Sequence, residues 1–384
     1  MSYLFLSCTE NNFTAILISC LIIFGIALTQ SRTAWVFAFV FLFWWLWKAT
    51  KIPTRINTRQ ILSFIGFYII CIATLPYISS YLGVTGIADG LTRATTGLNR
   101  IAMWHQMLLV IKNQPWFGYG WNQVGVAQVM ITLEYPVREY TEHAHNIILD
   151  IFIWNGIPIG LAIIIFLVWY LYRLSILATS FEPFIALAMV GAVLVHAMLE
   201  FPLEYAFFLL PVGLLLGLVQ AKERDVRVVV IPRFVGVMTL VISIALYIWV
   251  FIEYRIIEKD VQLARFESLN IGTLHAQDDA PNIILLTQLR EQVRFVRTQP
   301  TKNMSLEQLN WMKQVSYRYA TPTALFRYAQ ALALNNQLES AKKHLLIIEK
   351  LHGKKFSQQS LYIVNHSLSF EWNNTSNVAM KKDL

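Results

Sequence analysis

Residues 147–171, with the sequence IILDIFIWNGIPIGLAIIIFLVWYL, decide the fold class of this chain. Apart from Asp150, the segment carries no charged side chain. A helix needs about 20 consecutive, mostly apolar residues to cross the hydrocarbon core of a bilayer. The segment is long enough to do this, and we expect it to form a transmembrane helix.

Six further apolar segments have the same character. They are Phe13–Thr29, Ala34–Trp47, Ile61–Leu82, Phe184–Leu199, Tyr205–Val219 and Phe234–Ile252. The composition agrees, because 56% of the residues are hydrophobic and only 14% are charged, whereas soluble domains carry about 25% charged residues. The sequence therefore predicts an all-α protein, a polytopic bundle of about seven transmembrane spans.

Basic residues in the short loops predict the orientation of the spans, because cytoplasmic loops are enriched in Lys and Arg. They follow the second, fourth and sixth spans: Lys48, Lys51, Arg55, Arg59, Arg173, Lys222, Arg224, Arg227 and Arg233. If the spans alternate, all three loops face the cytoplasm, and the N-terminus lies inside. The formal net charge is +8, and the basic residues in the apolar part of the chain lie mostly in short loops, where they mark the topology. We therefore expect the lipid bilayer as a partner and no nucleic acid.

The chain divides into four expected regions. They are N-terminal spans at 1–82, an outer loop at 83–146, C-terminal spans at 147–252 and an outer helical domain at 253–384. In the last region the polar and apolar periodicity predicts helices at Leu306–Ala320, Pro322–Leu334 and Leu338–Leu351. The second and third of these, joined at an Asn-Asn turn, resemble a tetratricopeptide helix pair.

Ionisable side chains gather on the outer side, where their cost near a membrane makes them candidates for function. With their polar neighbours they are Arg32, Arg100, His105, Arg138, Glu139, Glu142, His143, His145, Asn146, Glu200 and Glu204. Arg32 stands beside Trp35, and Arg100 lies on an amphipathic helix that we expect to end near Asn113. Each is interpreted either as an interfacial or solvated arginine or as part of an anion site, because a guanidinium matches phosphate oxygens.

Two turn segments flank these candidates. Residues 115–121, PWFGYGW, stop the amphipathic helix with Pro and Gly, and their aromatic side chains suit a membrane interface. His143-Ala144-His145-Asn146 opens the fourth span, with Asn146 as the expected N-cap. The histidines are either interfacial caps or include a general base. A metal needs three or four ligands, and since only Glu142 or Asp150 lies nearby, we predict no metal.

His196 and Glu200 are four residues apart near the outer end of the fifth span. That spacing predicts that they share a helix face, before Pro202 ends the helix. The pair is either an ordinary structural contact or a carboxylate that orients a histidine or binds a sugar.

Together these segments resemble the O-antigen ligase superfamily, in particular the bacterial pilin-type O-oligosaccharyltransferases. The resemblance covers roughly residues 15–255, and the tail is similar to the C-terminal extension of that family. It rests on five motifs: Gln30-Ser31-Arg32-Thr33-Ala34-Trp35, Asn99-Arg100 with Trp104, Pro115-Trp116-Phe117-Gly118-Tyr119-Gly120, His143-Ala144-His145-Asn146, and His196-Ala197-Met198-Leu199-Glu200-Phe201-Pro202-Leu203. Nine residues separate Asn146, at the end of the fourth motif, from Gly156.

The resemblance implies a membrane glycosyltransferase. It would move a glycan from polyprenyl pyrophosphate to a hydroxyl, either of Ser or Thr in a pilin-like protein or of the lipid A core, the latter a step of lipopolysaccharide biosynthesis. It implies no cofactor, and a multi-pass protein of the bacterial inner membrane with a periplasmic C-terminal domain.

The resemblance also implies residue roles. Arg32 and Arg100 match the arginines that hold the pyrophosphate, and His145 matches the proposed base. The expected catalytic residues are His145, Arg100, Arg32, His143 and Glu200, and the expected substrate-binding residues are Arg32, Arg100, Asn146, Trp104 and Tyr119. The physical argument agrees, because arginines stabilise charge that develops on a leaving pyrophosphate and a positioned imidazole accepts a proton.

The chain departs from the family pattern at its start, because members carry several more spans before the Gln-Ser-Arg segment. It is therefore interpreted as a shortened enzyme, or as an inactive fragment. Other readings are an O-antigen ligase, an O-antigen polymerase and, in a different class, a non-catalytic membrane scaffold. The helical domain after Glu253 favours a protein acceptor, because it adds an external binding surface.

Overall fold

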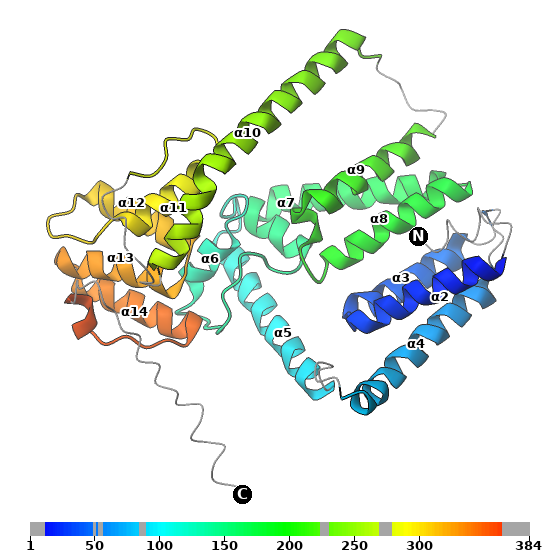
Figure 1. Cartoon of the computed structure of the whole chain (residues 1–384), viewed down its shortest axis with the longest axis horizontal. Coiled ribbons are helices and arrows are strands. Elements are labelled where there is room, and N and C mark those ends of the chain that lie inside the picture. The colour runs from blue at the N-terminus through cyan, green and yellow to red at the C-terminus, as the bar shows by residue number, and fades with distance from the viewer. Residues whose placement is uncertain are drawn as a thin grey trace, which may run out of the picture. The chain divides into compact units, whose positions relative to one another are not determined.

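A computed structural model describes residues 12–48, 51–52, 57–83, 90–222, 230–268 and 279–362, and every regular element in these ranges is a helix (Figure 1). The chain forms two compact units. The first comprises Met1–Ile131 and Thr141–Val229, and the second comprises Thr132–Tyr140 and Val230–Leu384. The all-α prediction is thus confirmed for the described residues.

Each predicted apolar segment lies in a helix, apart from one or two residues at the ends of three segments. Among the described residues, three helices are long and apolar enough to cross a membrane: α4 (Thr58–Tyr81), α7 (Ile147–Leu177) and α10 (Arg233–Ser268). Four apolar helices are shorter: α2 (Asn12–Thr29), α3 (Arg32–Lys48), α8 (Phe181–Ala197) and α9 (Ala206–Ala221). The chain is a helical membrane protein, and the number of spans stays a prediction.

Aromatic packing joins α3 to α8 in the first unit. The rings of Trp44 and Phe184 stack with centroids 4.4 Å apart. The buried Lys48 at the end of α3 donates hydrogen bonds to the carbonyls of Ile176 (3.2 Å) and Ala178 (3.3 Å). The C-terminal ends of α3 and α7 therefore meet, as alternating spans predict.

Helix α7 is broken at Gly156, whose backbone has φ 73° and ψ 177°. The break is filled by the turn that follows α5 (Gly90–Asn113). Tyr119 N donates to Ile153 O (2.7 Å), Gly120 N to Trp154 O (3.0 Å), and Ile157 N to Pro115 O (2.7 Å). These bonds pair backbone groups at the break that Gly156 and Pro158 leave without helical partners.

Two glycines make this interlock possible. Gly118 and Gly156 both have positive φ, at 67° and 73°. A Cβ on Gly156 would overlap the carbonyl of Trp116, and one on Gly118 would lie 2.6 Å from Gly156 N. Only glycine satisfies both the backbone conformation and the close approach.

Helices α5 and α6 (Val124–Ile131) pack on the first half of α7. Their buried side chains include Met107 and Val124, which cluster with Ile153 and Trp154. The predicted end of α5 at Asn113 is confirmed, whereas α6 was not predicted. This cluster fixes the helix that carries Arg100 to the helix that follows His145.

In its described part the second unit contains α10, four further α-helices and a short 3-10 helix at Gln359–Tyr362. The four α-helices are α11 (Thr287–Arg297), α12 (Leu306–Arg318), α13 (Pro322–Leu334) and α14 (Leu338–His352). The last three agree with prediction to within two residues, and the tetratricopeptide likeness stays a prediction. The expected span end at Ile252 stays a prediction, and the helix itself continues beyond it, because α10 extends to Ser268 and buries Ile257 and Ala264, one heptad apart.

A buried carboxylate joins α10 to the rest of the second unit. Glu253 accepts hydrogen bonds from the backbone N–H groups of Ile284 (2.9 Å), Leu285 (2.8 Å) and Leu286 (3.0 Å), and from Trp249 Nε1 (3.0 Å). It thereby caps the start of α11 from a distant position, so α10 and α11 are held as one body.

Candidate active site

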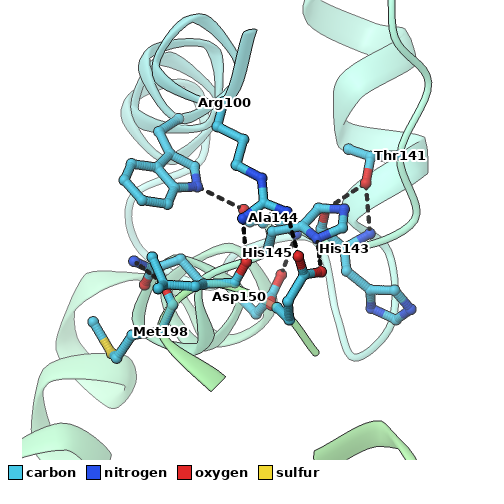
Figure 2. A network of polar contacts seen from close by, with 11 residues as sticks. Arg100, Thr141, His143, Ala144, His145, Asp150 and Met198 are labelled. Atoms are coloured by element: carbon cyan, nitrogen blue, oxygen red, sulfur yellow. Dashed lines mark hydrogen bonds and ion pairs between the residues drawn. The ribbon is translucent and has the colours of Figure 1, made fainter. Parts of the chain in front are cut away.

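Three predicted residues meet in the first unit. Arg100 of α5 forms an ion pair with Glu200, and its second terminal nitrogen donates to Leu199 O (2.9 Å). His145 Nδ1 lies 2.8 Å from the other carboxylate oxygen of Glu200. Arg100 and His145, labelled in Figure 2, thus contact the same carboxylate. The side chains are 36%, 24% and 33% exposed for Arg100, His145 and Glu200 respectively, so a ligand can reach all three.

Glu200 has a partner other than the expected one. We expected it to face His196 on a continuous helix, but α8 ends at Ala197. Only the backbone joins the two residues, since Glu200 N donates to His196 O (2.8 Å). The His196 ring packs edge-on against Phe208. Because the chain leaves the helix, the Glu200 carboxylate turns to His145, so the orienting function predicted for it falls on a different histidine.

The backbone of His145 adopts an uncommon left-handed conformation, with φ 50°. Both polar groups of the preceding residue, Ala144, are held. Trp104 Nε1 donates to Ala144 O (2.9 Å), and Ala144 N donates to Asp150 Oδ1 (2.8 Å). These contacts, drawn in Figure 2, stabilise the conformation that aims the imidazole at Glu200.

Asn146 caps α7, as predicted. Its side-chain oxygen accepts from Ile148 N (3.0 Å) and Leu149 N (3.3 Å). Its amide nitrogen donates to Met198 O (3.3 Å). One side chain therefore joins the start of α7 to the chain just before Glu200, which keeps His145 and Glu200 in register.

His143 and Glu204 form a second histidine–carboxylate pair, beside the one that contains His145. The His143 ring stacks on Phe201 with centroids 4.6 Å apart, and its Nδ1 lies 3.9 Å from Glu204 Oε1. Phe201 also contacts the His145 ring edge-on, at 5.1 Å. The backbone of His143 is fixed by Thr141, whose hydroxyl donates to His143 O (2.5 Å). Phe201 thus holds both imidazoles in place.

The charges at the centre of the site favour an ionised carboxylate. Burial raises the pKa of the Glu200 carboxyl, but hydrogen bonds and charge from Arg100 and His145 outweigh it, and the pKa lies below the ordinary glutamate value. Glu200 is therefore negative at neutral pH. It compensates the charge of the Arg100 guanidinium.

The hydrogen bonds described for Tyr119 are at the break of α7 and with Asn113, and not with the residues that meet at Glu200. Its backbone docks into the break of α7, and its hydroxyl accepts a hydrogen bond from Asn113 (3.3 Å). The backbone of Arg32 opens α3, but its side chain lies outside the described residues. Among the described residues no three His, Cys, Asp or Glu side chains are arranged to hold a metal ion.

Asp150, Phe201 and Glu204 were not assigned these functions from the sequence. Asp150 was considered only as a possible metal ligand, yet it is buried and holds Ala144. Its position as the one charge in an apolar span was the available signal, because such charges are retained for a partner. Phe201 gave no such signal, since aromatic residues are frequent throughout the chain.

Comparisons with known proteins extend this picture. Residues 17–164 match the family model described as "O-Antigen ligase", and residues 184–363 match the one described as "Virulence factor membrane-bound polymerase, C-terminal". Two separate parts of the chain are therefore similar to models of O-antigen ligases and membrane-bound polymerases. No solved structure matches the chain.

Two curated proteins from Acinetobacter baylyi are similar to the chain. It is 32% identical to a "General O-oligosaccharyltransferase" over 358 residues, which are 91% of this chain and 62% of that protein. It is 32% identical to a "ComP-specific O-oligosaccharyltransferase" over 216 residues, which are 56% of this chain and 39% of that protein. The chain thus spans less than two thirds of the length of these relatives.

Proposed function

We propose that this chain transfers a glycan from a polyprenyl-pyrophosphate donor to a hydroxyl of a protein acceptor. The observation that carries the proposal is the single carboxylate, Glu200, that holds a guanidinium and an imidazole at one place. When the pyrophosphate of the donor binds Arg100, the anomeric carbon of the attached glycan comes close to His145. The two curated relatives, both named as O-oligosaccharyltransferases, support the same reaction.

Arg100 is the proposed anion-binding group. A guanidinium offers five N–H donors, and the structure engages one terminal nitrogen with Leu199 O and the other with Glu200. The remaining donors are free to bind phosphate oxygens. Negative charge grows on the pyrophosphate as the anomeric bond breaks, so Arg100 stabilises the transition state more than the ground state. We propose that Arg32 binds the same group.

His145 is the proposed general base. The acceptor oxygen forms a bond to the anomeric carbon, the bond from that carbon to the pyrophosphate oxygen breaks, and the hydroxyl proton passes to the imidazole. Glu200 accepts a hydrogen bond from Nδ1, which leaves Nε2 as the acceptor for the proton. Glycan leaves with the acceptor, and polyprenyl pyrophosphate remains.

The other predicted residues support these two. Asn146 and Trp104 position the His145 segment through Met198 and Ala144, and we propose that His143 lines the acceptor side with Phe201. Tyr119 acts through the break of α7. We propose that its side chain also contacts substrate.

The acceptor is proposed to be a Ser or Thr of a pilin-like protein on the periplasmic side of the bacterial inner membrane. The names of the two relatives favour a protein acceptor. The match of residues 184–363 to a polymerase model favours a second candidate, in which the acceptor is a growing glycan. Transfer to lipid A core is the third outcome that an assay must separate.

A cell-based transfer assay tests the proposal. The chain is expressed in a host that makes a lipid-linked glycan and has no ligase of its own, with a tagged pilin as acceptor. Glycan on the pilin and on lipid A core is measured by gel shift and intact mass. We expect glycosylated pilin, background product with Arg100→Ala, and a loss of about 100-fold or more with His145→Ala.

The matched control is His105→Ala, because His105 is an exposed histidine of the same helix as Arg100. It should keep nearly full activity. Normal product from a well-expressed Arg100→Ala or His145→Ala would refute the proposed roles. A stably inserted wild-type chain that gives no product on any acceptor would favour a scaffold or an inactive fragment.

A further inference from the structure

Residues 115–121, which we call the aromatic loop, expose three large aromatic side chains. Trp116, Phe117 and Trp121 are 69%, 83% and 67% exposed. The loop is nevertheless tightly held, because its backbone forms three hydrogen bonds with residues at the break of α7. An exposed aromatic surface on such a fixed support indicates a contact with something outside the described chain.

The loop stands where an apolar helix of membrane length begins. Ile157–Leu177, the part of α7 after the break, is about 31 Å long at about 1.5 Å per residue, which matches a hydrocarbon core of about 30 Å. Its side chains are exposed along its length, for example Ile159, Ile165 and Val168. This part of α7 is therefore long enough to cross the bilayer alone.

The opposite end of the same helix carries a second interfacial group. Trp47 and Tyr172 stack with ring centroids 6.3 Å apart, and the Arg173 guanidinium lies 5.9 Å from the Trp169 ring. Tryptophan and tyrosine collect at both membrane–water interfaces, and basic residues mark the cytoplasmic one. The aromatic loop and this group thus lie at the two ends of one membrane-spanning segment.

We propose that the aromatic loop rests at the lipid–water interface, on the side of the Arg100–Glu200–His145 cluster, and sets the depth of that cluster. Asn146 lies ten residues before Gly156, so helix geometry places it no more than about 15 Å from the interface. The cluster is thereby kept near the headgroups, where the phosphate groups of a lipid lie.

Lipid is a better occupant than a sugar on the available contacts. Among the described residues the one ring contact of these three side chains is Trp121 on Trp154, with centroids 4.8 Å apart. Indole and phenyl rings insert at the level of the headgroups without polar partners, whereas the hydroxyls of a bound sugar need polar side chains to orient them.

Depth measurement by electron paramagnetic resonance tests the proposal. The whole chain, with Cys8, Cys20 and Cys71 replaced, is spin-labelled at Phe117→Cys and reconstituted in phosphatidylethanolamine–phosphatidylglycerol vesicles. Relaxation by oxygen is compared with relaxation by a water-soluble nickel complex. Controls are Ile165→Cys, in the middle of the same helix, and Glu307→Cys, exposed in the second unit.

We expect the Phe117 label to give a ratio between the two controls, at the level of the headgroup–acyl boundary. A ratio equal to that of Glu307→Cys would place the loop in water and overturn the proposal in favour of another ligand. A ratio equal to that of Ile165→Cys would place the break inside the hydrocarbon and also overturn it. A label at Trp116→Cys repeats the measurement if Phe117→Cys is poorly inserted.

Discussion

Replacing Glu200 by Gln removes the charge that Arg100 and His145 share while keeping the shape of the side chain. The His145 imidazole becomes positive as it accepts the proton, so its hydrogen bond to Glu200, at 2.8 Å, is stronger in the transition state than before it. A hydrogen bond to a charged group contributes about 1.5–3 kcal/mol. At about 1.4 kcal/mol for each factor of ten, kcat should fall roughly 10- to 150-fold. Because Glu200 is one-third exposed, we expect the lower part of this range.

The assay is single-turnover and steady-state transfer in proteoliposomes with lipid-linked glycan and purified acceptor. KM for the donor should not rise, because Arg100 gains free donors when the carboxylate is neutralised. Glu204→Gln is the matched control, since Glu204 lies near His143 and makes no described contact with Arg100 or His145. An unchanged kcat, or a raised KM with normal kcat, would refute the argument, because Glu200 would then be dispensable or would bind substrate directly.

Three further predictions follow from the geometry. Gly156→Ala should lower the apparent Tm in detergent by roughly 6–12 °C, from about 3 kcal/mol of backbone strain and overlap, whereas Gly213→Ala, in an open helical position, should not lower it. Trp104→Phe should slow transfer about 5- to 10-fold, because Ala144 O loses its donor; equal initial rates would contradict this. The pKa of Glu200 is lowered, so its stabilising contribution is present above the unfolded value of about 4.3 and is lost as pH falls through the lower folded value. The Tm difference between wild type and Glu200→Gln should accordingly stay constant from pH 7 to 5 and shrink below about pH 4; a loss between pH 7 and 5 would contradict the lowered pKa.

Local signals predicted much of the fold. Helices α12 and α13 start at the expected residues because Ser305 and Thr321 cap them, and α14 ends where Gly353 adopts a left-handed conformation. Helix α11 was not predicted, because the residue that caps it is distant in the sequence. Its start is capped by Glu253, 33 residues before Leu286, and no pattern within the segment itself reports that contact.

The sequence predicted which residues of the candidate site gather on the outer side of the membrane. It did not predict which of these residues contact one another. Sequence separation explains this, because Glu200 is 100 residues from Arg100 and 55 from His145. The helical spacing of His196 and Glu200 indicated the wrong histidine, since a helix end two residues earlier or later redirects the side chain. The end of α8 at Ala197 is set by tertiary contacts such as that of Asn146 with Met198.

The interlock of Gly118 with Gly156 also has a consequence for biogenesis. The carbonyls of Ile153 and Trp154 find their donors only when the turn that precedes them in the chain has docked. An inserting α7 therefore first exists as a 21-residue span, Ile157–Leu177, with an unfinished end. His145 lies between that turn and the break, so we expect the candidate site to become ordered only once the turn has docked on α7.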